Sequence, residues 1–102
     1  MKRRAVVFRP LAREDINKIY DNLAERVSEL SAFNYVNRIL SFCEKLDLMP
    51  ERGRLRDEVV ADMRTIIFQR KITIAYIITD DEVVIFRIFV KGEDWETKIT
   101  PP

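Results

Sequence analysis

The sequence has no histidine and only one cysteine, Cys43, among its 102 residues. A single cysteine cannot close an internal disulfide, and without histidine the usual zinc ligand sets cannot be assembled. We therefore expect no metal site and no cofactor. With no histidine to activate its thiol, Cys43 is expected to be a small buried core residue and not a nucleophile.

Glycine, proline, long apolar runs and net charge are also scarce. Two glycines and four prolines exclude collagen-like and low-complexity segments. The apolar run after the basic start covers only residues 5–8, too short for a signal-peptide core or a membrane span. Lysine and arginine number 18 against 17 acidic residues, so the net charge of +1 gives no general affinity for nucleic acid. The sequence therefore favours a cytoplasmic protein with no membrane partner and no specific DNA binding of its own.

The most strongly patterned stretch is rich in β-branched and aromatic residues. Residues 72–78 and 83–90 form two such runs, separated by the polar residues 79–82, and this arrangement predicts a β-hairpin. Alternation along the second strand predicts one set of side chains that faces a core, namely Val84, Phe86, Ile88 and Val90. The set that points away from this core consists of Val83, Ile85, Arg87 and Phe89. Because this set includes an arginine among apolar neighbours, we expect the chain itself to cover that face only partly.

The residues before the hairpin predict a short strand and two helices. A strand over residues 4–9 is followed at once by apolar residues at helical spacing, which predict an amphipathic helix over 11–27. Either Ser28 or Ser31 can cap a second helix that runs to about Leu48. The short connection predicts that the two helices are antiparallel neighbours.

An irregular basic stretch over residues 50–58 leads to a third strand of the sheet over 64–68. A chain of this length can bury one core but not two, so residues 1–102 are expected to form a single domain. The predicted fold class is α+β, with the order β-α-α-β-β-β. We expect a mostly antiparallel sheet with a helical hairpin packed on one face.

Several short motifs follow one another along the chain. They are Phe8-Arg9-Pro10-Leu11-Ala12-Arg13-Glu14-Asp15-Ile16, Cys43-Glu44-Lys45-Leu46, Pro50-x-x-Gly53, Arg54-x-Arg56-Asp57-Glu58, Met63-Arg64, Ile74-Ala75-Tyr76 and Val84-Ile85-Phe86-Arg87-Ile88. No single motif is specific. Their order and spacing, over nearly the whole chain, resemble the ParE branch of the RelE/ParE toxin superfamily, the toxin half of bacterial toxin–antitoxin modules.

This resemblance implies the toxin of a type II toxin–antitoxin system, with DNA gyrase as its target and a ParD-like antitoxin as its inhibitor. The alternative within the superfamily is a RelE-like ribonuclease that cuts messenger RNA on the ribosome. Such cleavage needs a base, an acid and cations around the reacting phosphate. Candidate cations on the sheet are Arg64, Arg87 and Lys91, with Lys71 nearby. Trp95 stands where an acid–base residue is needed, and its indole has no titratable proton. We therefore expect no catalytic residue and target binding without chemistry.

The antitoxin is expected to bind the sheet face that the helices leave uncovered. Its C-terminal segment, as an amphipathic helix or an added strand, would cross Arg87 and Phe89 and reach the basic loop. The candidate partner-binding residues are Arg52, Arg54, Arg56, Arg64, Ile85, Arg87, Phe89 and Trp95.

Some of these residues also have structural interpretations. The loop arginines can be solvated, with their charge offset by Asp57 and Glu58. Arg87 can form an internal ion pair in place of a partner contact. Trp95 can pack on the sheet or under a partner, and we favour the partner. Tyr76 is expected to be a buried or hydrogen-bonded core residue and not a functional phenol.

Overall fold

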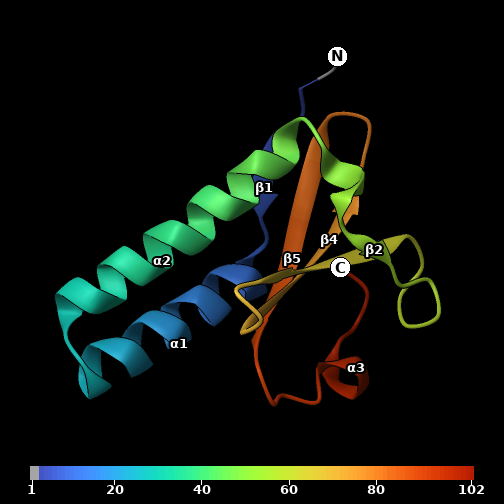
Figure 1. Ribbon diagram of the computed structural model, residues 1–102. Helices are drawn as coiled ribbons and strands as arrows, with labels where there is room; N and C mark the ends of the chain where they lie inside the picture. Colours follow the sequence, from blue (N-terminus) through green and yellow to red (C-terminus); the bar gives the residue numbers. More distant parts are fainter. Residues whose placement is uncertain (1–2) are drawn as a thin grey trace.

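The computed structural model describes residues 3–102, so the first two residues of the predicted domain lie outside the described part (Figure 1). The sheet has five strands, β1 (Ala5–Phe8), β2 (Arg54–Leu55), β3 (Met63–Phe68), β4 (Ile72–Ile78) and β5 (Glu82–Val90). The α-helices are α1 (Pro10–Arg26), α2 (Glu29–Glu44) and α3 (Trp95–Lys98), and the short 3-10 helices are η1 (Lys45–Asp47) and η2 (Pro50–Arg52). Every predicted helix and strand is present, and β2 and α3 are additional.

The strands are ordered β1-β5-β4-β3-β2 across the sheet. β1 runs parallel to β5, whereas every other neighbouring pair is antiparallel. The parallel pair is possible because the chain between β1 and β5 includes both long helices, which provide the long connection that parallel strands need. Figure 1 shows these helices side by side on one face of the sheet, and the predicted α+β fold with its helical hairpin is confirmed.

Local sequence sets the ends of the two long helices. Pro10 lies in the first turn of α1, where its missing amide proton would have no intrahelical acceptor in any case. Ser28 is the N-cap of α2, and its side chain accepts a hydrogen bond from the backbone amide of Ser31 at 3.0 Å. Of the two predicted caps, Ser28 is therefore the one used. The α-helix ends at Glu44, and η1 extends the helical region to just before the predicted end at Leu48.

The sheet face under α1 and α2 carries the larger apolar cluster. Its buried members are Ala12, Ile39, Cys43, Leu46, Phe68, Ile72, Ile74, Tyr76, Val83, Ile85 and Ile88. Cys43 is fully buried, as predicted. Burial raises the pKa of the Cys43 thiol to about 12, so a reactive thiolate does not form near neutral pH.

A β-bulge in β5 decides which of its side chains face these helices. Ala75 of β4 pairs with Arg87, but the next residue, Tyr76, pairs with Ile85. Phe86 is therefore an extra residue in β5, and the alternation of side chains changes phase there. The sequence contains no glycine or proline at this position that would have signalled the bulge.

The bulge makes the predicted assignment of side chains to the two faces wrong. The residues of β5 that lie in the helix-side cluster are Val83, Ile85 and Ile88, of which only Ile88 was predicted there. Phe86 lies on the opposite face, and Val90 is 41% exposed at the end of the strand. The prediction assumed strict alternation along β5, which holds only where the pairing of β4 with β5 has no irregularity.

The opposite face of the sheet carries a second apolar cluster. Its buried members are Val60, Met63, Ala75, Phe86, Phe89 and Ile99, with Trp95 packed against them. Figure 1 shows α3 and the segment after it beside the sheet, away from the helical hairpin. The expectation that the chain itself covers this face only partly is therefore wrong, because Phe89 is fully buried there. A helix of four residues is too short to show a period in the sequence. Within residues 3–102, no helix is long and apolar enough to cross a membrane.

Candidate partner-binding surfaces

Arg87 lies in an ion pair within the molecule. Its Nε and Nη2 donate to the two carboxylate oxygens of Asp15 on α1, at 2.8 and 3.1 Å. One of these oxygens also accepts a hydrogen bond from the backbone amide of Ile88 at 2.8 Å. Hydrogen bonding to Asp15 raises the pKa of Arg87. Of the two interpretations of Arg87, the internal ion pair is the one formed, and it ties α1 to β5 beside the bulge.

Tyr76 fixes the basic loop to the sheet. Its buried hydroxyl donates to the carbonyl oxygen of Pro50 at 2.5 Å and accepts from the amide of Gly53 at 2.9 Å. A Cβ atom at position 53 would overlap the Tyr76 hydroxyl, so glycine is required by this close approach. Arg64 donates to the carbonyl of Gly53 at 2.9 Å. Tyr76 is therefore the hydrogen-bonded core residue that was predicted, and Arg64 helps to hold the loop.

Arg56 is the most enclosed of the three loop arginines. Its guanidinium lies 2.7 Å from the carboxylate of Glu58, 3.4 Å from that of Glu96 and 5.0 Å from the ring centre of Trp95. The hydrogen bond between Arg56 and Glu58 raises the pKa of the arginine and lowers the pKa of the glutamate. The predicted charge compensation within the loop is confirmed for this pair.

Arg52 and Arg54 keep more of their surface available. Arg52 is exposed, with its guanidinium 5.8 Å from the ring centre of Phe42, and Arg54 is exposed on β2. Their predicted contact with an acidic partner stays a prediction.

The apolar partner-binding candidates are buried within the chain. Phe89 is fully buried, and its ring stacks on Trp95 with 5.8 Å between ring centres. Ile85 is fully buried under the helices. The predicted exposure of Ile85 and Phe89 is therefore wrong. Ile85 faces the helices because of the bulge, and Phe89 is covered by α3. Trp95 packs on the sheet, so the partner is not needed to cover it.

The cations considered for a ribonuclease site are already bound or lie at the end of the sheet. Arg64 is bonded to the loop carbonyls, and Arg87 is bonded to a carboxylate. Lys91 donates its backbone amide to the carbonyl of Lys71 at 2.8 Å, beyond the last paired residues of β4 and β5. The fold does not present Arg64 and Arg87 as free cations for a reacting phosphate.

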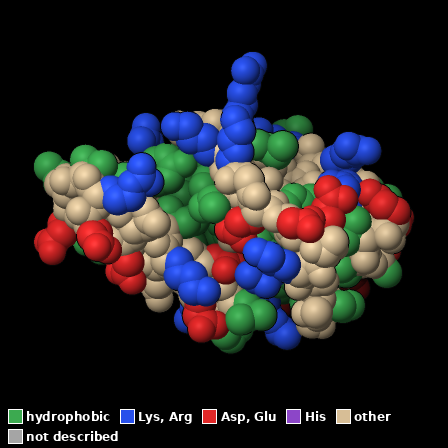
Figure 2. Space-filling view, turned by 90° about the horizontal axis from the view of Figure 1, so that it is seen from below, with side chains coloured by type: hydrophobic (Ala, Val, Ile, Leu, Met, Phe, Trp, Pro, Cys, Tyr) green, Lys and Arg blue, Asp and Glu red, His purple; other side chains and the backbone are tan. Residues whose placement is uncertain are grey.

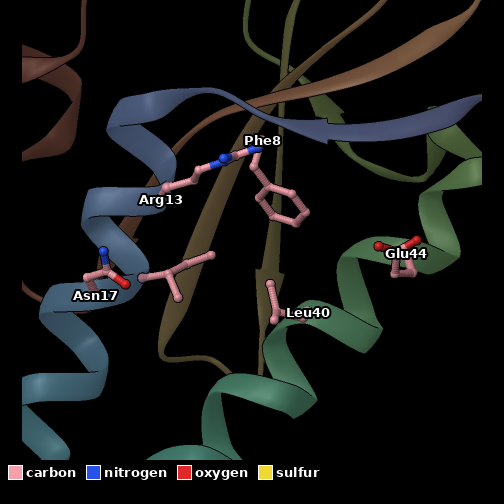
Figure 3. Close-up of a pocket in the computed structure, with 6 residues that line it drawn as sticks. Phe8, Arg13, Asn17, Leu40 and Glu44 are labelled. Atoms are coloured by element: carbon pink, nitrogen blue, oxygen red, sulfur yellow. The ribbon is translucent and has the colours of Figure 1, made fainter.

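A hollow of about 450 Å³ lies between α1 and α2, next to the end of β1 (Figure 3). Its lining residues are Phe8, Arg13, Ile16, Asn17, Leu40 and Glu44. Figure 3 shows the Phe8 ring and the Leu40 side chain directed into the space between the helices, with Arg13 and Glu44 at its sides. We call this hollow the hairpin groove. A partly buried apolar floor with charged sides suits the apolar face of an amphipathic segment. Sequence periodicity did not predict the groove, because the period of each segment does not show how α1, α2 and β1 lie relative to one another.

The outer edge of β1 continues from this groove. β1 has only β5 as a sheet neighbour among the described residues. The amides of Ala5 and Arg9 donate toward β5, to the carbonyls of Asp81 and Ile85. By alternation along the strand, the amides of Val6 and Phe8 therefore point to the opposite, outer side. An edge of this kind can accept an added strand from a partner.

The sequence matches a family model described as the ParE toxin of the type II toxin–antitoxin system parDE, over residues 6–95. This range includes the hairpin groove, the basic loop and all of the sheet except Ala5, the first residue of β1. No curated protein sequence gives a significant match.

Solved structures with a similar fold include toxin–antitoxin assemblies. A chain of the chromosomal ParDE system of P. aeruginosa is 22% identical with a TM-score of 0.75, and the alignment covers 85% of this chain and 95% of that chain. A chain of the RelBE2 toxin–antitoxin complex of Mycobacterium tuberculosis is 21% identical with a TM-score of 0.69, covering 91% and 97%. A conserved hypothetical protein of Helicobacter pylori is 20% identical with a TM-score of 0.55, covering 87% and 96%. At these identities the likeness shows a shared fold.

Proposed function

Since the chain belongs to the ParE toxin family of type II toxin–antitoxin systems, we propose that it acts in the cytoplasm by inhibiting DNA gyrase. We further propose that a ParD-like antitoxin neutralises it. The family match over residues 6–95 is the observation that carries this proposal. The similar fold of a chain from a ParDE system is consistent with it.

Inhibition by this chain would consist of binding, with any DNA cleavage performed by gyrase itself. The sequence has no histidine to serve as a general base or acid. The Arg87 guanidinium is already paired with Asp15, and Arg64 is bonded to two backbone carbonyls. A guanidinium that is committed to a carboxylate has less capacity to stabilise the extra charge of a phosphorane. These contacts favour the gyrase-directed toxin over a ribonuclease.

The test compares two reactions with the same purified toxin. Supercoiling of relaxed plasmid by purified gyrase is measured over a toxin titration, beside cleavage of messenger RNA on translating ribosomes. We expect inhibition of supercoiling and intact messenger RNA, and addition of the ParD-like antitoxin should restore supercoiling. Ribosome-dependent cleavage with gyrase unaffected would overturn the proposal and identify a RelE-like ribonuclease.

The antitoxin site is proposed at the hairpin groove and the outer edge of β1, in place of the sheet face around Phe89. The groove offers an apolar floor for the apolar face of a helix, and the outward amides of Val6 and Phe8 offer hydrogen-bonding positions for an extended segment, past the Arg4 amide that is bonded to Asp47. Arg13 and Glu44 on the two sides of the groove can pair with opposite charges on the antitoxin and set its direction. The hairpin groove and the outer edge of β1 adjoin each other, because Phe8 is the last residue of β1 and also lines the groove.

Calorimetric titration with antitoxin tests this site. Leu40→Ala removes an apolar contact from the groove floor, and we expect it to weaken binding by at least about 1 kcal/mol, the usual threshold for a contributing interface residue. Ile67→Ala is the matched control, because Ile67 is a large apolar residue of β3 that is 60% exposed outside the groove. Trp95→Ala probes the face that was first predicted. Weaker binding by Trp95→Ala with unchanged binding by Leu40→Ala would return the site to that face.

A further inference from the structure

The end of the helical hairpin presents large apolar side chains to solvent. Val27, Leu30 and Phe33 are 65%, 70% and 57% exposed. The first lies directly after α1, and the other two lie one turn apart near the start of α2, where spacing by three residues puts them on one side of the helix. Figure 1 shows that the turn between the helices projects beyond the sheet. We call these three residues the hairpin tip.

The tip is separate from the surfaces described above. None of its residues lines the hairpin groove, and none belongs to either apolar cluster of the sheet. Isolated apolar residues on a surface need no explanation, but neighbouring ones on a projecting turn mark an interaction site. Since both apolar clusters form without these three side chains, packing in the core does not explain why they are apolar.

Exposed acidic residues lie close to the tip in the sequence and outnumber the basic ones there. Asp21, Glu25 and Glu29 are exposed, and no ion pair within residues 3–102 involves them. Arg26 is the one basic residue between them in the sequence, and its guanidinium donates to the side chain of Asn22. Figure 2 shows hydrophobic side chains at the hairpin end of the molecule, on the left, with acidic side chains beside them. A partner that fits this end is therefore apolar at its centre and basic at its rim.

The area of the tip decides between a second copy of the chain and a larger partner. Three such side chains cover on the order of a few hundred Å², whereas a stable interface takes about 800 Å² from each partner. Two convex tips in contact would bury little more than these side chains and would bring acidic rims together. A hollow on a larger protein can also enclose the flanks of α1 and α2, and a basic rim complements their charge.

We propose that the hairpin tip inserts into an apolar hollow with a lysine- and arginine-rich rim on the target protein. This inference rests on the proposed function, under which the target is gyrase. The toxin would thus hold its antitoxin at the hairpin groove and the β1 edge, and its target at the hairpin tip.

The test uses two double variants of the full chain. Leu30→Gln/Phe33→Gln removes the apolar character of the tip without adding charge. Met49→Gln/Ile67→Gln is the matched control, since both residues are large, apolar and 60% exposed at other places. Because all four side chains are exposed, the thermal midpoints should stay close to that of the parent. Each protein is assayed for inhibition of gyrase supercoiling, for antitoxin affinity by calorimetry and for self-association by sedimentation.

We expect the tip variant to need at least about tenfold more protein for half-inhibition of gyrase, while the control stays within about twofold and both bind antitoxin as tightly as the parent. Glu25→Gln/Glu29→Gln should weaken inhibition more at low salt than at high salt. Equal inhibition by the parent and the tip variant would overturn the tip proposal and leave the proposed function standing. Loss of antitoxin affinity in the tip variant, or a parent dimer that this variant abolishes, would also overturn it by identifying another occupant. A parent chain that does not inhibit gyrase would overturn both proposals.

Discussion

The two faces of the sheet are covered by elements of very different size. On one face, α1 and α2 provide 17 and 16 residues of helix. On the other, α3 provides four residues, supported by the segment after it and by the loop before β3. Phe89 on the second face is nevertheless as fully buried as Ile85 on the first. Burial of a sheet face therefore depends on a few well-placed contacts and not on the length of the covering helix.

The same comparison locates the open surfaces of the molecule. The face with the long helices keeps the hairpin groove, because Phe8, Ile16 and Leu40 between these helices and β1 are only partly buried. The face with the short helix is closed by the stacking of Trp95 on Phe89 and by the contact of Arg56 with Trp95. The hairpin of α1 and α2 thus leaves a groove that suits a partner. The segment around α3 is held by fewer contacts, so its local unfolding should cost less free energy.

The largest expected effect concerns the core under the long helices. Ile88→Ala should lower the free energy of unfolding by roughly 2–5 kcal/mol, the range for large apolar truncations in a core. Val90→Ala, two residues later on the same strand, should cost well under half as much because Val90 is 41% exposed. Denaturant unfolding of both variants measures the difference. Equal losses would show that Val90 is as buried as Ile88 and contradict the exposed end of β5.

The next effect concerns the link between α1 and β5. Asp15→Ala leaves the Arg87 guanidinium and the amide of Ile88 without their shared acceptor, and it should cost about 2–3 kcal/mol. Asp15→Asn keeps an acceptor and should cost less. A double-mutant cycle with Arg87→Met, followed by denaturant unfolding, gives the coupling energy. Additive losses in that cycle would contradict the ion pair.

A smaller effect is expected on the face with the short helix. Trp95→Ala removes the stacking partner of Phe89 and should cost about 1–2 kcal/mol, because Trp95 is itself only partly buried. Hydrogen exchange in the variant should become faster in α3 while α1 is unchanged. A loss as large as that of Ile88→Ala, with faster exchange throughout, would show that the two faces form one cooperative core.

The smallest effect in ordinary buffers is the alkaline titration of Cys43. Its pKa is raised from 9.0 to about 12 by burial, so the folded state keeps a proton that the unfolded state has lost. The stability from this group is complete below pH 9 and is lost as the pH rises toward 12. At pH 10 the loss should be ~1 kcal/mol. Cys43→Ala should fall less steeply with pH over this range, and parallel curves for the two proteins would contradict the assignment.

Local sequence patterns predicted the elements with strong periodicity and the residues whose environment follows from composition. The hairpin of β4 and β5 and the two long helices were predicted from spacing and residue type, and Ser28 was one of the two caps that the sequence offered for α2. The burial of Cys43 and of Tyr76 followed from the absence of an activating histidine and from the amphipathic nature of tyrosine. Family resemblance added the toxin class.

Features that depend on contacts between distant segments were not predictable in this way. The bulge at Phe86 lies in the pairing of β5 with β4, which alternation along one strand does not show, so alternation placed Ile85 on the wrong face. The capture of Arg87 by Asp15 joins residues 72 positions apart. α3 is too short for a periodic signal, so Trp95 and Phe89 were expected to need a partner. The hairpin groove is lined by residues of β1, α1 and α2, and no single element's sequence shows how the three lie together.

The most direct test of the contrast between an open groove and a closed sheet face is amide hydrogen exchange of the toxin, alone and bound to the proposed ParD-like antitoxin. We predict that binding slows exchange at the outward amides of Val6 and Phe8 and along the helix residues of the hairpin groove, with little change in α3. Slower exchange confined to α3 and the end of β5, with β1 unchanged, would contradict the account and place the antitoxin on the face around Phe89.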